Sequence, residues 1–164
     1  MGTWTNDDGL YIKYGTTEAT AALGGEVMTM EGEHKAVISF GYDDLAAFGT
    51  TKIMSDNVVI PNGALIKSAL LYVETAFSTA SSPTLTIGTI DQNRSTVTAP
   101  DDDADGIDAT IAASALGDAV TVTCDGALIG DVLGDSVLIT MLVGTADFTD
   151  GRAKLTITWY IPDA

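Results

Sequence analysis

The chain has 164 residues and is 46% apolar, enough for one folded domain with a hydrophobic core. Its net charge of −16 should repel nucleic acid and anionic membranes, so we expect neither as a partner. The single cysteine, Cys124, excludes an intrachain disulfide, and no apolar run approaches the ~20 residues that span a bilayer. The N-terminus lacks the pattern of a signal peptide, so we expect a protein made in the cytoplasm.

The first 25 residues predict an N-terminal arm or a first strand. They are mostly small and polar, and residues 10–14 form a short strand candidate. An arm could order on a partner, and large side chains are common anchors at interfaces. The anchors would be Trp4, Leu10, Tyr11 and Tyr14. In the alternative, the segment is a strand of the chain's own sheet; in either case residues 26–164 should form a single β-sandwich domain.

The densest β signal lies in residues 57–90. It contains a short apolar run, a Pro61-Asn62-Gly63 turn, a run that is apolar on both faces, and an alternating segment at 84–90. A strand that is apolar on both faces is covered on both, so we interpret this region as the central hairpin of a sandwich. Further strands are predicted at residues 35–41, 50–55, 119–124, 136–144 and 154–161.

Helical signals are few. Residues 107–116 have helical spacing of apolar side chains and predict one short helix, while residues 43–48 fit either one helical turn or a loop. About eight short strands with polar turns and at most one short helix are typical of an all-β, jelly-roll-like β-sandwich. In the last strand, Trp159 falls on the apolar face and Tyr160 on the other. Tyr160 is therefore the better candidate for a partner contact.

An acidic loop at residues 100–106 is the one candidate metal site. Asp101, Asp103 and Asp105 match the first, third and fifth positions of a helix-loop-helix calcium loop. The twelfth position, which needs a bidentate carboxylate, is Ala112, and no helix precedes the loop. A solvated surface loop is therefore favoured over a calcium site, and no metal is expected.

The residues that enzymes use are scarce. His34 is the one histidine, and its two neighbouring glutamates do not have a spacing that closes a metal shell. Cys124 has no local base, and the sequence contains no nucleophile elbow or phosphate-binding loop. We expect a protein that is not an enzyme and needs no cofactor. A carbohydrate-binding face would need several exposed aromatic residues on one strand pair, and core packing is the favoured interpretation of the aromatic residues.

Two stretches resemble small virion proteins of tailed bacteriophages, especially marine ones. The first is IPNGALIKSALLYVETAF at residues 60–77, followed by SSPTLTIG at 81–88. The second is VGTADFTDGRAKLTI at residues 143–157, followed by the aromatic-apolar-proline sequence Tyr160-Ile161-Pro162 near the end of the chain. The resemblance covers roughly residues 57–164. A weaker likeness exists to sandwich modules of bacterial surface proteins.

The resemblance implies a compact β-sandwich that works by binding other proteins. The leading hypothesis is a capsid cement or decoration protein on the outer surface of the virion, which bridges subunits of the major capsid protein and forms a trimer. A neck, tail or head-fibre component is a second hypothesis. The third is a carbohydrate-binding module for host attachment. Strong negative charge agrees with an outer surface and disagrees with a shell lining packed against DNA.

Overall fold

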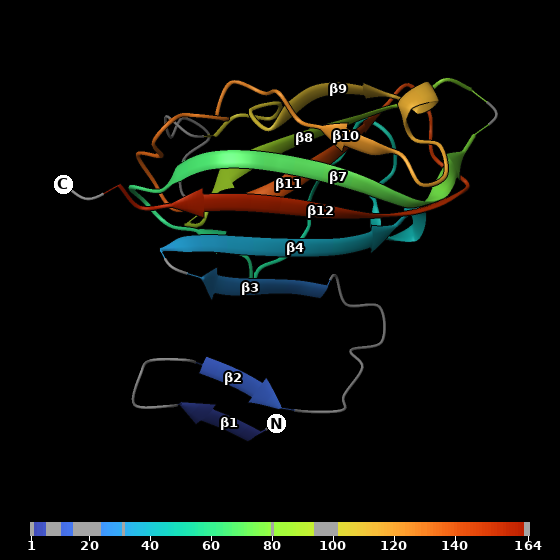
Figure 1. Cartoon of the computed structure of the whole chain (residues 1–164). Helices are drawn as coiled ribbons and strands as arrows, with labels where there is room; N and C mark the ends of the chain where they lie inside the picture. Colours follow the sequence, from blue (N-terminus) through green and yellow to red (C-terminus); the bar gives the residue numbers. More distant parts are fainter. Residues whose placement is uncertain are drawn as a thin grey trace.

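The protein is an all-β sandwich of two antiparallel sheets packed face to face, as predicted (Figure 1). The computed structural model describes residues 2–5, 11–14, 24–30, 32–79, 81–93 and 102–162. The first sheet has the order β10 (Thr121–Thr123), β7 (Leu65–Ser78), β12 (Asp150–Tyr160), β4 (Glu33–Gly41) and β3 (Gly24–Met30). The second has the order β5 (Thr51–Ile53), β11 (Val137–Gly144), β8 (Thr84–Asp91) and β9 (Asp108–Ala112), with β6 (Val59–Ile60) also paired to β11.

The strand pairing is nested along the chain. β4 pairs with β12, β5 and β6 pair with β11, β7 pairs with β10, and β8 pairs with β9. The pair that is outermost in the chain, β4 with β12, lies in the first sheet, and the next pair lies in the second sheet. The two inner pairs alternate between the sheets in the same way. This arrangement is the double Greek key of a jelly roll, which confirms the predicted architecture.

The core lies between the two sheets and is built by alternation along the strands. In β12, Leu155, Ile157 and Trp159 are buried, while the residues between them face outward. This is the pattern the sequence predicts for residues 154–161. The other sheet contributes inward side chains from β8 and β11, including Ile87 and Met141. A rigid two-layer body results, with loops at both ends.

The interpretation of residues 57–90 as a central hairpin is wrong. β7 and β8 are consecutive strands, but they belong to different sheets, and residues 79–83 cross between the layers. β7 is also not covered on both faces, because Leu70 and Tyr72 are 39% and 43% exposed. A bulge at Lys67 places Ile66 on the same inner face as Ala69, which a strict alternation would not allow.

β11, in contrast, is buried on both faces. Val137, Ile139 and Met141 point into the core, and Leu138 and Thr140 on the opposite face are each 2% exposed. One reason is that the connection from β8 to β9 folds over this sheet at Gly88, where a Cβ would lie 2.3 Å from backbone atoms of Asp103 and Ala104. The second sheet is therefore partly covered by its own chain.

The predicted helix at residues 107–116 is a strand and a turn. Residues 108–112 form β9, and Ala113–Ala115 forms a single 3₁₀ turn. A shift in the pairing of β8 with β9, between Leu85 and Ile87, disturbs the alternation of β9 and gives the buried residues a helix-like spacing. Another 3₁₀ turn, Tyr42–Asp44, begins the segment predicted to be a helical turn or loop. No helix in the described ranges is long and apolar enough to cross a membrane.

Candidate interaction surfaces

The predicted N-terminal anchors fall on a two-stranded ladder. β1 (Gly2–Thr5) pairs antiparallel with β2 (Tyr11–Tyr14), and the register places Trp4 opposite Ile12 and Tyr11 opposite Thr5. Leu10 lies outside the described residues. A two-stranded ladder is marginally stable by itself in water, so a role in contacting a partner stays a prediction.

The acidic loop holds its described carboxylates close to its own backbone. Asp101 lies outside the described residues. An oxygen of Asp102 accepts a hydrogen bond from the backbone N–H of Asp91, and Asp103 Oδ1 accepts one from the N–H of Asp105 at 3.3 Å. The side chain of Asp103 raises the pKa of Asp105 through a hydrogen bond. Among the described residues no cluster of three metal-ligating side chains occurs, and the calcium site remains an untested candidate.

Cys124 does not have the environment of a reactive thiol. It is buried at the end of β10, and burial, with Asp108 and Asp125 nearby, raises its pKa to about 12. The Asp108 carboxyl beside it is also buried, and this burial raises the pKa of Asp108. A thiol with such a pKa is almost entirely protonated at neutral pH, so it is a poor nucleophile. Cys124 is therefore packed as a small buried hydrophobic side chain.

Four connections meet at one end of the sandwich. Hydrogen bonds join them in pairs: Phe48 N–H to Asp147 Oδ1 (2.6 Å), Thr149 N–H to the Ser78 carbonyl (2.9 Å), and Ala113 N–H to the Pro83 carbonyl (3.1 Å). Beneath them, Phe77 packs edge-on against Phe148 with ring centroids 5.0 Å apart. This end, which we call the loop end, is therefore held together by backbone bonds above an aromatic cluster.

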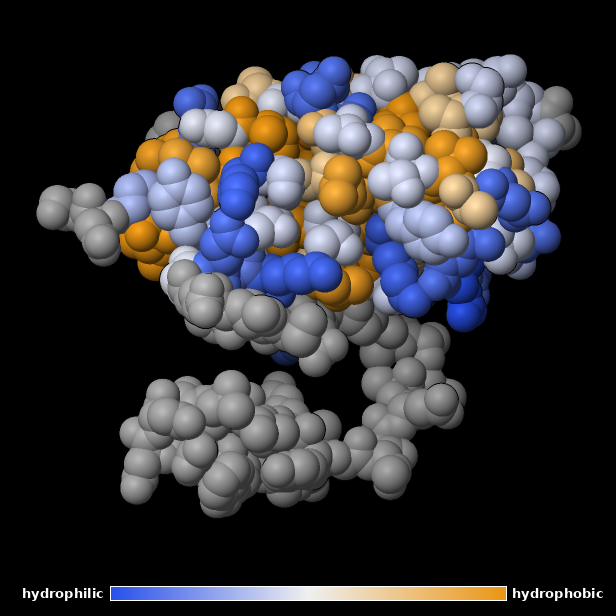
Figure 2. All heavy atoms as spheres, viewed as in Figure 1, coloured by the Kyte–Doolittle hydropathy of each residue, from blue (hydrophilic) through white to orange (hydrophobic). Residues whose placement is uncertain are grey.

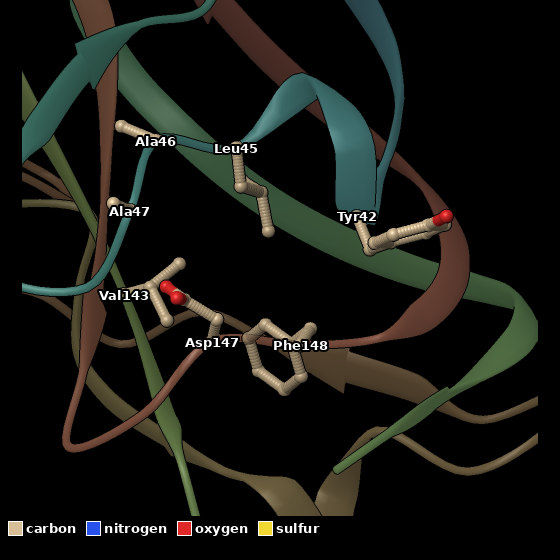
Figure 3. Close-up of a pocket in the computed structure, with 7 residues that line it drawn as sticks. All are labelled: Tyr42, Leu45, Ala46, Ala47, Val143, Asp147 and Phe148. Carbon is tan, nitrogen blue, oxygen red and sulfur yellow. The ribbon is translucent and has the colours of Figure 1, made fainter.

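A pocket of about 210 Å³ opens at the loop end (Figure 3). In Figure 3 the side chains of Leu45, Val143 and Phe148 point toward the same space, and the Asp147 carboxylate lies at its edge. Tyr42, which also lines the pocket, is 41% exposed, and nearby Phe48 is 56% exposed. One carboxylate and one tyrosine do not complete a metal shell, and the accessible lining does not form an apolar binding cavity.

The sequence analysis did not select Tyr42 or Phe48 as site residues. An aromatic residue in a loop can be buried or exposed, and the difference depends on how loops far apart in the chain meet. One signal in the sequence could have identified them. Residues 45–48 form an apolar run directly after Asp43 and Asp44, and this run lacks the alternation of a strand that would bury one of its sides.

The broad outer face of the first sheet is the second candidate surface, which we call the sheet face (Figure 2). Leu70 and Tyr72 of β7, the strand next to the central strand β12, are exposed on this face, and the cross-strand neighbours of Leu70 are Thr123 and Thr156. Threonine, serine and lysine fill most of the remaining positions on β12 and β4. Figure 2 shows apolar groups interspersed among these polar ones rather than one large apolar patch.

Two ion pairs lie on the sheet face. Lys154 Nζ is 2.5 Å from Glu74 Oε1, and Lys67 pairs with Glu33. Exposed pairs of this kind contribute little to stability, because water and salt screen their attraction. Tyr160, predicted as a partner contact, lies half-buried on the same face opposite Glu33 and Leu65. Its position is compatible with the predicted role, which stays a prediction.

Chains from three phage capsid structures share this fold. The match in the capsid asymmetric unit of cyanophage Pam1 has a TM-score of 0.52 and 16% identity, over 96% of this chain and 98% of that chain. A chain of the acidic stable capsid of Helicobacter pylori bacteriophage KHP30 has a TM-score of 0.55 and 14% identity, over 85% of this chain and 95% of that chain. A chain of the Ralstonia phage GP4 capsid has a TM-score of 0.52 and 14% identity, over 78% of this chain and 86% of that chain. At these identities the comparisons show a shared fold.

No protein-family model matches the chain, and no curated protein matches it by sequence. The fold similarity to phage capsid chains agrees with the resemblance to virion proteins noted in the sequence, and it reaches beyond residues 57–164.

Proposed function

We propose that this protein is a structural component of a phage capsid, and specifically a cement or decoration protein on the outside of the shell. The single observation that supports this most is the match to a chain in the cyanophage capsid asymmetric unit over nearly the full length of both chains. The two proteins are thus of similar size as well as similar fold. The partner would be the major capsid protein, and the protein would act as a trimer.

The physical properties of the molecule support this role. A rigid jelly roll presents loops, an open sheet face and strand edges without requiring a conformational change on binding. The charge of −16 favours a surface in contact with solvent over one packed against DNA. In the described part of the chain, the pocket and the buried Asp108–Cys124 pair do not assemble the groups for catalysis, and we propose a non-enzymatic protein.

The test is reconstitution on empty heads assembled from the major capsid protein of the same phage. We expect the purified protein to sediment with the heads, to saturate, and to raise the temperature at which the heads rupture. An unrelated acidic protein of similar size and charge is the control for non-specific binding. Failure to sediment with the heads, or binding that leaves the rupture temperature unchanged, would contradict the cement role. Binding only to isolated necks or tails would favour the second hypothesis from the sequence.

A further inference from the structure

We propose that the sheet face is the surface through which this protein docks, and that it fits an acidic protein surface bearing an apolar protrusion. The proposal rests on the capsid role above, in which that partner surface belongs to the shell. The protein that binds the sheet face is therefore a different protein. The tests below also distinguish the case in which a second copy of this chain binds there.

Charge is divided sharply between the sheet face and the rest of the molecule. Of the five basic residues with described side chains, four lie on the sheet face: Lys35, Lys67, Arg152 and Lys154. The described acidic side chains on this face are Glu33 and Glu74. The other described charged side chains are fourteen aspartates and Lys52. These aspartates lie in loops, in the first 3₁₀ turn or at strand ends, so among the described surfaces an acidic partner would meet less repulsion at the sheet face.

The sheet face also has the shape and size of a docking surface. Leu70 and Tyr72 lie on β7, and Val37 lies on β4, on the other side of the central strand β12. Lys154 is the cross-strand neighbour of Tyr72, and Lys35, Lys67 and Arg152 lie farther along the strands. Many protein interfaces are only about as apolar as the rest of the surface, so such a mixed face is suitable for docking. Four spacings of about 4.8 Å between five strands that average about 29 Å in length give a flat area of roughly 600 Å². A standard interface needs about 800 Å² per partner, so the face supplies most of it.

The two sheets differ in how their outer faces are covered. The second sheet has Leu138 and Thr140 buried on its outer face, and the backbone of Asp103 and Ala104 packs over Gly88. On the first sheet, Leu70 and Tyr72 of β7 remain exposed. Within the described residues, the chain thus covers the outer face of the second sheet with its own connection and leaves these two side chains of the first sheet uncovered.

The charge pattern favours an acidic partner over a second copy placed face to face. In a face-to-face pair, the basic residues of one copy would approach those of the other, which costs free energy. The carboxylates of an acidic surface would instead pair with Lys35 and Arg152 and would compete with Glu74 for Lys154. The apolar protrusion of that surface would contact Tyr72. Such a contact should weaken as salt rises, because the charges at the rim are exposed to solvent.

The test is hydroxyl-radical footprinting of native particles and of the purified protein. Tyr72 on the sheet face and Tyr42 at the loop end are 43% and 41% exposed, so they form a matched pair. We expect oxidation of Tyr72 to fall about tenfold in particles and oxidation of Tyr42 to change less than twofold, since a buried interface centre excludes solvent. Protection of Tyr42 with Tyr72 still exposed would overturn the proposal and assign docking to the loop end. Absence of the chain from particles would overturn the capsid role and, with it, this partner.

A second measurement uses variants in binding to empty heads. Tyr72→Asp should weaken binding about tenfold or more, while Phe48→Asp, at an exposed site (56%) at the loop end, should not. Lys154→Glu should weaken binding more at low salt than at high salt, with Lys52→Glu as its control. If wild-type protein binds heads and the Tyr72→Asp variant binds equally well, the capsid role stands and the sheet-face proposal fails. If Tyr72→Asp instead abolishes self-association of the purified protein, the occupant is a second copy and the proposal is wrong.

Discussion

Gly88→Val is expected to destabilise the protein by about 3 kcal/mol, which for a chain of this size lowers the melting temperature by about 9 °C. A Cβ at position 88 would lie 2.3 Å from the backbone of Asp103 and Ala104, closer than real contacts allow. The 103–107 segment would have to move away, with loss of the hydrogen bonds from Thr89 N–H to the Asp103 carbonyl (2.7 Å) and from Ile107 N–H to the Ile87 carbonyl (3.1 Å). Thermal unfolding followed by circular dichroism measures the effect.

The control for this substitution is Gly117→Ala. A Cβ at position 117 would meet only Val120 Cγ2 at 3.7 Å, which is an ordinary van der Waals distance. We expect its melting temperature to stay within about 2 °C of wild type, because no neighbouring atom must move. Equal melting temperatures for Gly88→Val and wild type would show that the β8–β9 connection does not pack on the second sheet as described.

Trp159→Ala should destabilise the protein by about 3–5 kcal/mol, as large aromatic truncations in cores do. Trp159 is 1% exposed and is the largest fully buried side chain of the described core. It lies in the central strand β12 between His34 of β4 and Ile66 of β7, and its ring stacks on that of His34 with centroids 5.7 Å apart. Equilibrium unfolding in urea gives the free energy of unfolding for each variant.

Trp159→Phe separates packing from hydrogen bonding at the same site. The buried Nε1 of Trp159 makes no hydrogen bond with the described residues, so phenylalanine would keep much of the packing and lose no bond. We expect it to cost less than half as much as Trp159→Ala. Equal losses for the two variants would contradict this and would indicate that the indole N–H has a partner. Tyr160→Ala, at the half-buried neighbouring position, serves as the surface control.

The strands with simple alternation could be predicted from the sequence because alternation directly reports which side is buried. Residues 154–161 fall in such a strand, β12, and its buried face is the expected one. The fold class followed from the number of such segments. The connection from β7 to β8 could not be predicted, because a hairpin turn and a crossover between sheets both appear in sequence as a polar loop between two β runs.

Bulges account for the other errors. An extra residue at Lys67 changes the face on which Ile66 falls, and the irregular register between β8 and β9 produced the helical spacing near residues 107–116. Neither bulge has a distinctive local sequence, since it arises from pairing with a distant strand. Periodicity analysis assumes regular elements and therefore misassigns the segments around a bulge.

The candidate surfaces were harder to predict than the fold. Leu70 and Tyr72 appeared to be core residues, because whether the outer face of a strand is covered depends on what packs against it and not on the strand itself. The placement of the charges was partly visible: aspartate favours turns, and Lys154 lies within the alternating segment 154–161. The gathering of the basic residues on one face required the strand order β7-β12-β4, which brings residues from distant parts of the chain together.

The central claim is that this protein works in the virion, as a repeated contact between shell subunits. Mass-spectrometric quantitation of purified particles, with the major capsid protein as the internal reference, tests it most directly. We predict on the order of hundreds of copies per particle, in a fixed ratio to the major capsid protein, because a cement protein follows the symmetry of the shell. A dozen copies or fewer would contradict the cement role and favour a neck or tail part, and absence from particles would contradict a virion role altogether.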